Sequence, residues 1–196
     1  ITQGKVLYVG VCNHYAWQMA EMLGKAALHN RQPIVSAQVS YSILDRVIEN
    51  ETVPFSRKFN VAIMAYGPLA GGILTGKYRR GEAPPKGSRF SHPRAAEKFL
   101  TDEVFDLVEQ LEDIAARNGM AINQLAIKWV LSRPGITTPI LGGSKREHFQ
   151  PMYGLFDMEV DPEDLALIDE ISERRRYQPF RNQAQVDGYP LGPVYW

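Results

Sequence analysis

The stretch that decides the fold is Val61–Tyr78, which reads VAIMAYGPLAGGILTGKY. Its first six residues, ending at Tyr66, are all apolar and lack the polar alternation of a half-exposed strand. Such a run is typical of a parallel strand covered on both faces. The run breaks at Gly67-Pro68 and continues into a loop that contains Gly71-Gly72 and Gly76-Lys77.

This loop has the composition of a ligand-binding loop. A buried strand that opens at its C-terminal end into glycine-rich chain is where α/β proteins bind ligands. Small residues let the backbone approach a phosphate closely, and Lys77 would supply a positive charge. A surface turn also uses glycine and proline, so composition alone leaves a ligand loop and a plain turn both open.

The composition indicates one globular domain over residues 1–196. With 196 residues, of which 44% are hydrophobic, the chain can bury a sizeable core. The formal net charge is zero, so we expect neither a nucleic acid nor an anionic membrane as a partner. A single cysteine excludes an intrachain disulfide framework and favours a reducing, cytoplasmic location.

Several kinds of site and segment are missing from the sequence. No apolar run approaches the roughly 20 residues that span a bilayer, and Ile1–Gly10 lacks the pattern of a signal peptide. Four scattered histidines and one cysteine predict no metal site. Neither a Walker A motif nor GxGxxG is present. The chain begins at Ile1 without methionine and runs almost at once into a predicted strand, which we interpret as a cut.

Strands and helices alternate in the pattern, which predicts an α/β fold. The predicted strands are Lys5–Val11, Ile34–Val39, Val61–Tyr66 and Thr137–Leu141. The predicted helices are Tyr15–His29, Glu49–Phe59, Thr101–Asn118, Ile122–Ser132, a short one through His148 and Met152, and one that opens at Asp161. Asp45 and Arg46 are interpreted as a structural ion pair.

Several separated motifs resemble the aldo-keto reductase family. AYGPLAGGILTGKY, followed by PPKGSRF, is similar to the family's seventh strand and the loop after it. The similarity runs from GKVLYVGVCN through AQVSYSILDR to TTPILGGS. It is closest to the long-loop branch, which includes aflatoxin-aldehyde-reductase-like enzymes and potassium-channel β subunits. The resemblance implies a (β/α)8 TIM barrel, of which this chain matches only the C-terminal half, strands 5–8 with their helices.

The resemblance implies four contacts with a nicotinamide ring, from Cys12, Asn13, Gln38 and Tyr66. Family members have a serine or a similar residue at Cys12, and a thiol is a weaker hydrogen-bonding group. A buried, inert cysteine is the alternative for Cys12, and a helix cap is an alternative or additional role for Asn13. Gln38 could instead bond only to backbone, and Tyr66 could be a core aromatic.

The resemblance also implies contacts with the rest of NADP(H). Around the pyrophosphate it implies backbone groups and cationic side chains from Gly67, Pro68, Leu69, Ala70, Gly71, Lys77, Ser88 and Arg89, under a cofactor-covering loop at 79–98. Around the adenosine 2′-phosphate and adenine it implies Gly142, Gly143, Ser144, Lys145, His148 and Met152. Gly67 often is serine in the family, His148 stands where the family has Gln or Arg, and Pro151-Met152 replaces a Glu-Asn pair.

The implied function is NADP(H)-dependent reduction of an aldehyde or ketone, a small-molecule carbonyl substrate, to an alcohol. The family's catalytic tyrosine, lysine, aspartate and histidine come from its first four strands, so we predict no catalytic residue in this chain. Open sheet edges invite pairing, so we expect the missing N-terminal half or a second copy as partner. The C-terminal tail, 174–196, either borders a substrate pocket or frays.

Two other functions remain open. One is a non-catalytic nicotinamide-nucleotide-binding or interaction module, and the other is an inactive truncated product. Binding of the cofactor without turnover would favour the module. Turnover restored by an added N-terminal half would favour the enzyme.

Overall fold

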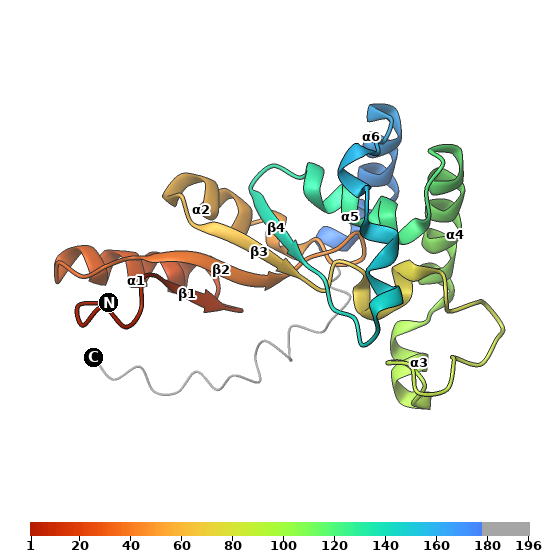
Figure 1. Ribbon diagram of the computed structural model, residues 1–196, viewed down its shortest axis with the longest axis horizontal. Coiled ribbons are helices and arrows are strands. Elements are labelled where there is room, and N and C mark those ends of the chain that lie inside the picture. Colours follow the sequence, from red (N-terminus) through yellow and green to blue (C-terminus); the bar gives the residue numbers. More distant parts are fainter. Residues whose placement is uncertain (178–196) are drawn as a thin grey trace.

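The computed structural model describes residues 1–177, which form an α/β fold around one parallel sheet (Figure 1). The sheet has four strands in the order β1-β2-β3-β4: Val9–Cys12, Ile34–Ser40, Ala62–Tyr66 and Ile136–Ile140. Because every neighbouring pair is parallel, the carboxyl ends of all four strands lie at the same edge. The α/β prediction is confirmed.

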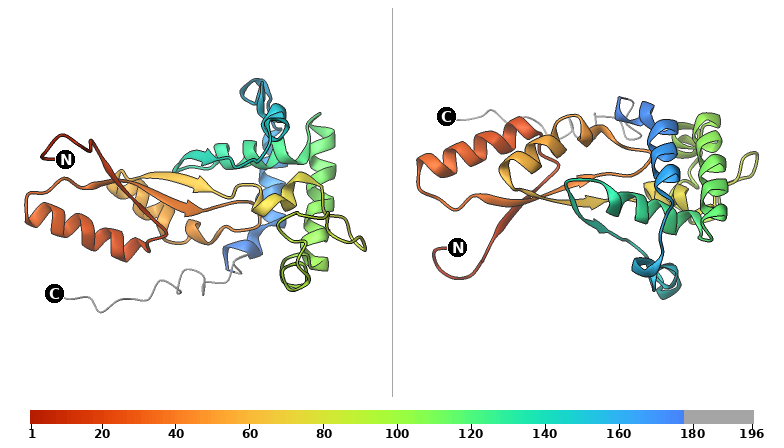
Figure 2. Two further views of the ribbon diagram at one scale, coloured as in Figure 1. Left: turned by 60° about the horizontal axis from the view of Figure 1, so that its bottom comes forward. Right: turned by 90° about the horizontal axis from the view of Figure 1, so that it is seen from above.

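The molecule is elongated, and six helices lie at its two ends within residues 1–177. They are α1 (Ala16–Leu28), α2 (Thr52–Phe59), α3 (Pro93–Phe99), α4 (Asp102–Arg117), α5 (Ile122–Ser132) and α6 (Pro162–Ile171). Short 3-10 turns lie at Val47–Glu49, Ala70–Thr75, Arg146–His148, Gln150–Met152, Leu155–Asp157 and Glu173–Arg176. Helices α1 and α2 lie beside the sheet at one end, and α4, α5 and α6 gather at the other (Figures 1 and 2).

The first strand is shorter than predicted. The sequence pattern predicts a strand from Lys5, but β1 begins at Val9, where its pairing with Ile34 of β2 starts. Leu7 and Tyr8 are 78% and 73% exposed. β-Branched and aromatic residues favour a strand only where a neighbouring strand and a packed face support them, and β1 is at the edge of the sheet.

One face of the sheet is buried and the other is partly exposed. Ile63 and Ala65 of β3 are fully buried and pack toward the helices. Met64 and Tyr66, which point to the opposite face, are only partly buried within the described chain. The apolar run therefore predicts the strand correctly, and its second face is only partly covered within residues 1–177.

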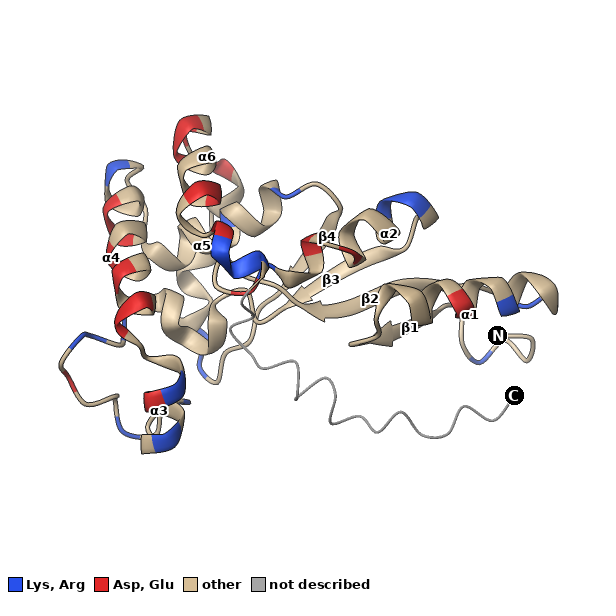
Figure 3. Cartoon of the chain, turned by 180° about the vertical axis from the view of Figure 1, so that it is seen from behind, with Lys and Arg blue, Asp and Glu red and all other residues tan. Residues whose placement is uncertain are grey.

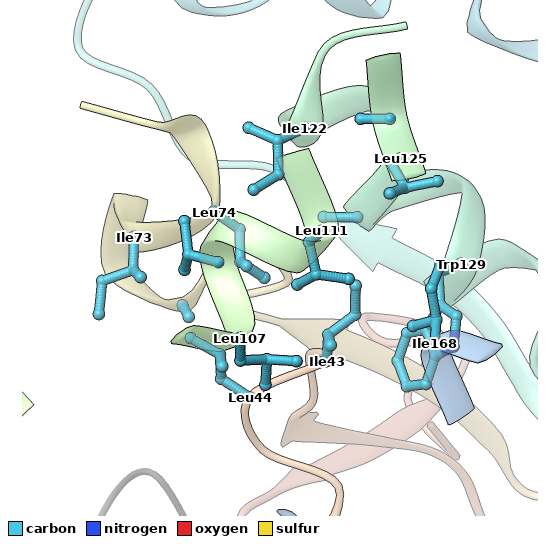
Figure 4. Packing of buried hydrophobic residues seen from close by; sticks show 14 of the residues in the cluster. Ile43, Leu44, Ile73, Leu74, Leu107, Leu111, Ile122, Leu125, Trp129 and Ile168 are labelled. Carbon is cyan, nitrogen blue, oxygen red and sulfur yellow. The ribbon is translucent and has the colours of Figure 1, made fainter. Parts of the chain in front are cut away.

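The main hydrophobic core lies between the glycine loop after β3 and helices α4, α5 and α6 (Figure 4). Leu74 of the loop, Leu111 of α4, Leu125 of α5 and Ile168 of α6 are all fully buried. Each such side chain contributes roughly 1.5–3 kcal/mol through removal of apolar surface from water. This packing holds the loop against the helices and so fixes the position of its glycines.

The predicted helix starts are confirmed where a cap residue is present. The side chain of Thr101 accepts a hydrogen bond from the Val104 amide at the start of α4. The carboxylate of Asp161 accepts one from the Glu163 amide at 2.8 Å at the start of α6. Pro54 lies in the first turn of α2, where a missing amide hydrogen costs little.

The predicted cofactor-covering loop and the predicted tail differ in part from the structure. The final residues of stretch 79–98 belong to α3, so this stretch is not loop throughout. The predicted tail 174–196 lies mostly outside the described residues, and its first residues close the turn Glu173–Arg176. None of the helices in residues 1–177 combines the length and the apolar character needed to cross a membrane.

Candidate functional site

Four predicted site residues meet at the carboxyl edge of the sheet. The Tyr66 hydroxyl donates a hydrogen bond to Oδ1 of Asn13 at 3.0 Å. The thiol of Cys12 lies 3.8 Å from Oε1 of Gln38, and the Asn13 amide donates to the Gln38 carbonyl oxygen at 2.9 Å. Strands β1, β2 and β3 therefore contribute to one polar cluster, which we name the carboxyl-edge cluster: Cys12, Asn13, Gln38 and Tyr66.

Strand register and one backbone conformation create this cluster. Cys12 pairs in register with Gln38, so their side chains point to the same face of the sheet. Asn13 adopts a left-handed conformation with φ +54°, which asparagine tolerates better than most residues, and this ends β1. His14 was not predicted as a site residue. Its Nδ1 atom lies 2.9 Å from the carbonyl oxygen of Cys12.

Three alternatives to a binding role for these residues do not match the structure. Cys12 is exposed, so it is not a buried core cysteine. Asn13 does not cap α1, because Tyr15 occupies the N-cap position and donates its amide to Oε1 of Gln18 at 2.9 Å. Tyr66 is partly exposed, so its ring is not simply a core aromatic.

The loop after β3 folds through a series of left-handed residues. Gly67, Gly71, Gly72 and Gly76 all have φ between +69° and +98°. Ala70 has φ +49°, a conformation that costs an L-residue about 1–2 kcal/mol. The amides of Ala70 and Gly72 donate to carbonyl oxygens within the loop, so those two are engaged by the loop itself.

Lys77 and Arg89 lie directly over the Gly71-Gly72 pair. A Cβ atom added to Gly72 would be 2.7 Å from Nζ of Lys77. A Cβ atom added to Gly71 would be 3.0 Å from Cδ of Arg89. The glycines therefore leave room for the Lys77 ammonium group at Gly72 and for the stem of Arg89 and the Phe90 ring at Gly71.

Two buried hydroxyls sit beside these cations. Oγ of Ser88 and the hydroxyl of Tyr78 are both buried and have no hydrogen-bond partner within residues 1–177. The Nζ atom of Lys77 lies 5.2 Å from the centroid of the Tyr78 ring. A buried hydroxyl without a partner is unfavourable, so a polar ligand that reached Ser88 would remove a cost that the loop now carries.

The segment after β4 differs from its prediction. Gly142, Gly143, Ser144 and Lys145 are exposed, and the predicted helix is instead two 3-10 turns. Pro151, which lacks an amide hydrogen, occupies the second turn, and its carbonyl oxygen accepts from Nε2 of Gln124 in α5 at 2.6 Å.

Because 3-10 turns replace the predicted helix, the segment after β4 does not provide the helix N-terminus that would favour an anion. The Ser144 amide donates to Nδ1 of His148 at 3.2 Å, so His148 holds the turn together. Met152, in the following 3-10 turn Gln150–Met152, is partly buried. An α-helix N-terminus would have concentrated free amides, whereas this turn offers side chains and charge from Ser144 and Lys145.

The sequence did not predict a second cluster of charged residues, which lies in the chain that follows β2. The predicted ion pair between Asp45 and Arg46 is wrong: Ser40 donates to Asp45, whereas Arg46 binds both oxygens of Glu49 at 2.8 and 2.9 Å. Burial alone would lower the pKa of Arg46, but the hydrogen bonds and charge of Glu49 outweigh it and raise that pKa. The i,i+3 spacing of Arg46 and Glu49 was the available signal.

Tyr41 completes this second cluster. Its hydroxyl donates to Glu49 at 2.6 Å, and burial together with the charge of Glu49 raises the pKa of Tyr41 well above its usual range. Tyr41 thus stays protonated and serves as a hydrogen-bond donor. Throughout residues 1–177, no group of three or more histidine, cysteine, aspartate or glutamate side chains could hold a metal ion.

Known proteins resemble this chain over most of its length. A probable voltage-gated potassium channel subunit beta of Arabidopsis thaliana is 34% identical over 91% of this chain and 56% of that protein. An uncharacterized oxidoreductase, YrpG of Bacillus subtilis, is 27% identical over 87% of this chain and 50% of its own length. A probable aryl-alcohol dehydrogenase, AAD4 of Saccharomyces cerevisiae, is 27% identical over 87% of the chain and 52% of its own.

The chain spans about half the length of these relatives. The family model described as the aldo/keto reductase family matches residues 1–173, which include all four strands and the loop after β3. The motifs that suggested the family therefore lie within one continuous match. The chain belongs to the aldo/keto reductase family.

Proposed function

We propose that this chain provides the cofactor-binding side of an NADP(H)-dependent oxidoreductase that reduces an aldehyde or ketone to an alcohol. The observation that carries the proposal is the position of Lys77 and Arg89 over Gly71-Gly72, in the loop that leaves the strand carrying Tyr66. The Lys77 ammonium group beside Gly72, with the side chain of Arg89 packed against Gly71, suits a pyrophosphate. Family membership and relatives named as oxidoreductases support the class of reaction.

The carboxyl-edge cluster would hold the nicotinamide end. Asn13 and Gln38 carry amides, which pair well with the nicotinamide carboxamide, and the Tyr66 ring offers a flat apolar face. The hydrogen bond from Tyr66 to Asn13 would keep the ring in place. When bound, the cofactor supplies the hydride, while these side chains orient its ring.

The remaining predicted residues would hold the phosphates and the adenosine. The Ser88 hydroxyl, which precedes Arg89 in the sequence and has no hydrogen-bond partner within residues 1–177, would suit a phosphate oxygen. Gly67, Pro68, Leu69 and Ala70 would shape the loop backbone around the pyrophosphate. Ser144 and Lys145 are exposed and would favour NADP(H) over NAD(H) by contacting the 2′-phosphate, near Gly142, Gly143, His148 and Met152.

We further infer that the parallel sheet corresponds to strands 5–8 of a (β/α)8 barrel. Support comes from the four parallel strands, from their partly exposed face and from relatives about twice as long. In this architecture the proton donor and its supporting residues come from strands outside this sequence, and none of the predicted site residues acts as the acid. The single cysteine supports a cytoplasmic location.

A second candidate function is a non-catalytic nucleotide-binding or interaction module. The observation that favours it is the Arabidopsis relative, which is named a potassium channel subunit and is 34% identical to this chain. The two candidates differ in turnover, which only the enzyme would show. Oxidation of NADPH by a panel of aldehydes, in the presence of the missing strands, separates the two.

The cofactor proposal is tested by NADPH binding to charge variants. We expect Lys77→Gln and Arg89→Gln each to weaken binding by roughly tenfold, because each removes a charge-assisted contact with a phosphate. Lys86→Gln is the matched control, since Lys86 is exposed in the same loop and is not among the predicted site residues. Equal losses in all three variants would mean that only the net charge matters, and the proposed site would be wrong.

A further inference from the structure

A groove on the side of the molecule away from the glycine loop has no role in the proposed reaction. It has a volume of about 660 Å³, within the range of small-molecule sites. Its walls come from α2, from the chain after β2, from the junction of α5 and β4, and from α6 with the turn after it. Figure 3 shows basic residues at the end of α2 and in the turn after α6.

The two acidic residues that line the groove are already bound to its own side chains. Glu49 accepts hydrogen bonds from Tyr41 and from two nitrogens of Arg46. Asp169 accepts one from Nε1 of Trp129 at 2.9 Å and is ion-paired with Arg133. These carboxylates hold the floor of the groove in place and have little capacity left to attract further cations.

Positive charge is therefore left over. Five cationic side chains and two carboxylates line the groove: Arg46, Arg57, Lys58, Arg133 and Arg176 against Glu49 and Asp169. Arg46, Arg133 and Arg176 are ion-paired with carboxylates, and Arg176 is paired with both Glu49 and Glu173. Among these five, the charges left uncompensated within residues 1–177 are those of Arg57 and Lys58. The carboxyl end of α2 subtracts about half a charge through the helix dipole. Arg57 and Lys58 therefore give the groove a local positive charge, in a chain whose formal net charge is zero.

The two cations at the end of α2 are available for a ligand. Arg57 and Lys58 are exposed, and no ion pair of either is found within residues 1–177. The stem of Arg57 packs against Gly135, where an added Cβ would lie 3.2 Å from its Cγ. This contact holds the aliphatic part of the side chain against the junction of α5 and β4, and Arg57 also lines the groove.

We propose that this groove binds a small organic anion: a phosphate or carboxylate group attached to an apolar body. Arg57 and Lys58 would bind the anionic group. Val53, Pro54 and Pro134 provide an apolar wall for the body of the ligand. None of these residues belongs to the proposed nicotinamide-nucleotide site, so this second site stands without it.

The test uses phenyl phosphate as probe and the intact 196-residue chain. Backbone amide chemical shifts are followed by NMR during titration, first alone and then with excess NADPH. We expect saturable shifts at Val53, Lys58 and Gly135 that persist with NADPH. The double variant Arg57→Gln/Lys58→Gln should weaken binding roughly five- to thirtyfold, because it removes two ion pairs with the anion.

The control variant carries the same change of charge elsewhere. Lys5→Gln/Arg31→Gln neutralises two exposed cations near β1 and the end of α1, outside the groove lining, and should leave the affinity unchanged. Both double variants alter exposed residues, so circular dichroism should show that each folds. Absence of shifts around the groove, or equal affinity in the two double variants, would overturn the proposal. Loss of the shifts only with NADPH would assign the probe to the nucleotide site instead and would also overturn it.

Discussion

Gly72 has no side chain, and both the conformation of the loop and the position of Lys77 depend on this. Its φ is +98°, and an added Cβ would lie 2.7 Å from Nζ of Lys77. We expect Gly72→Ala to lower the free energy of unfolding by about 1–3 kcal/mol, because the backbone conformation is unfavourable for alanine and Lys77 must move. Urea denaturation measures the change.

Gly24 provides the matched control for this substitution. It lies in the interior of α1, and an added Cβ meets nothing within 4 Å. Gly24→Ala should therefore raise the free energy of unfolding by about 0.5–1 kcal/mol. If both variants change stability in the same direction, the loop conformation described for Gly72 is wrong.

Asp164 gives a prediction for the pH dependence of stability. The hydrogen bond from Arg117 holds the pKa of its carboxyl below the usual range, with a further contribution from Asn118. A lowered pKa stabilises the fold above the unfolded-state value of about 4, and this contribution is lost as the pH falls through the folded-state value. We expect Asp164→Asn to be less stable than the wild type at pH 7.

The stability difference should shrink as the pH falls below about 4, where the unfolded chain binds a proton at Asp164, and should vanish once the pH is below the lowered folded-state pKa. Urea midpoints measured from pH 7 down to pH 2.5 follow it. Asp157→Asn, at an exposed position, should show little difference at any pH. A difference for Asp164→Asn that stays constant over this range would contradict the role given to its ionised form.

Single residues also show what sequence reasoning could and could not reach. The placement of Asn13, Gln38 and Tyr66 in one cluster could be predicted, because parallel strands carry their carboxyl ends to one edge. The exposure of Cys12 could not, since it depends on β1 being an edge strand. The true partner of Arg46 depended on a choice between Asp45 and Glu49 that rotamers and packing decide.

At the scale of elements, α4 offers a test of how local signals stabilise a helix. Thr101 caps it by accepting from the Val104 amide. Thr101→Ala should cost about 1 kcal/mol of unfolding free energy, because that amide loses its partner, whereas Thr101→Asp should cost much less. Thermal and urea unfolding measure both variants. Equal losses for alanine and aspartate would show that the cap does not contribute.

Element boundaries were predictable where the sequence carries caps and a regular apolar stripe, as in α4 and α5. They were not predictable where tertiary contacts decide. Helix α3 forms in a polar stretch that Pro93 opens, and Phe99 at its end packs with Phe90 at a centroid distance of 5.3 Å. The helix expected through His148 is replaced by turns that Pro151 and its contact with α5 favour.

For the whole molecule, the partly exposed face and edges of the sheet predict association. Within residues 1–177, the outer edges of β1 and β4 pair with no further strand, and such edges, together with a partly buried face, favour contact with another chain. We expect size-exclusion chromatography with light scattering to find a concentration-dependent oligomer, which the addition of the family's missing strands converts to a different complex. A monomer that persists at all concentrations would argue against an incomplete barrel.

The account as a whole rests on a nicotinamide-nucleotide site built from the carboxyl-edge cluster and the glycine loop. Calorimetric titration of the chain with NADPH, and in parallel with NADH, tests it most directly. We expect saturable binding of NADPH, about tenfold tighter than NADH if Ser144 and Lys145 contact the 2′-phosphate. Absence of NADPH binding up to millimolar concentration would contradict the claim that these residues form a cofactor site in this chain.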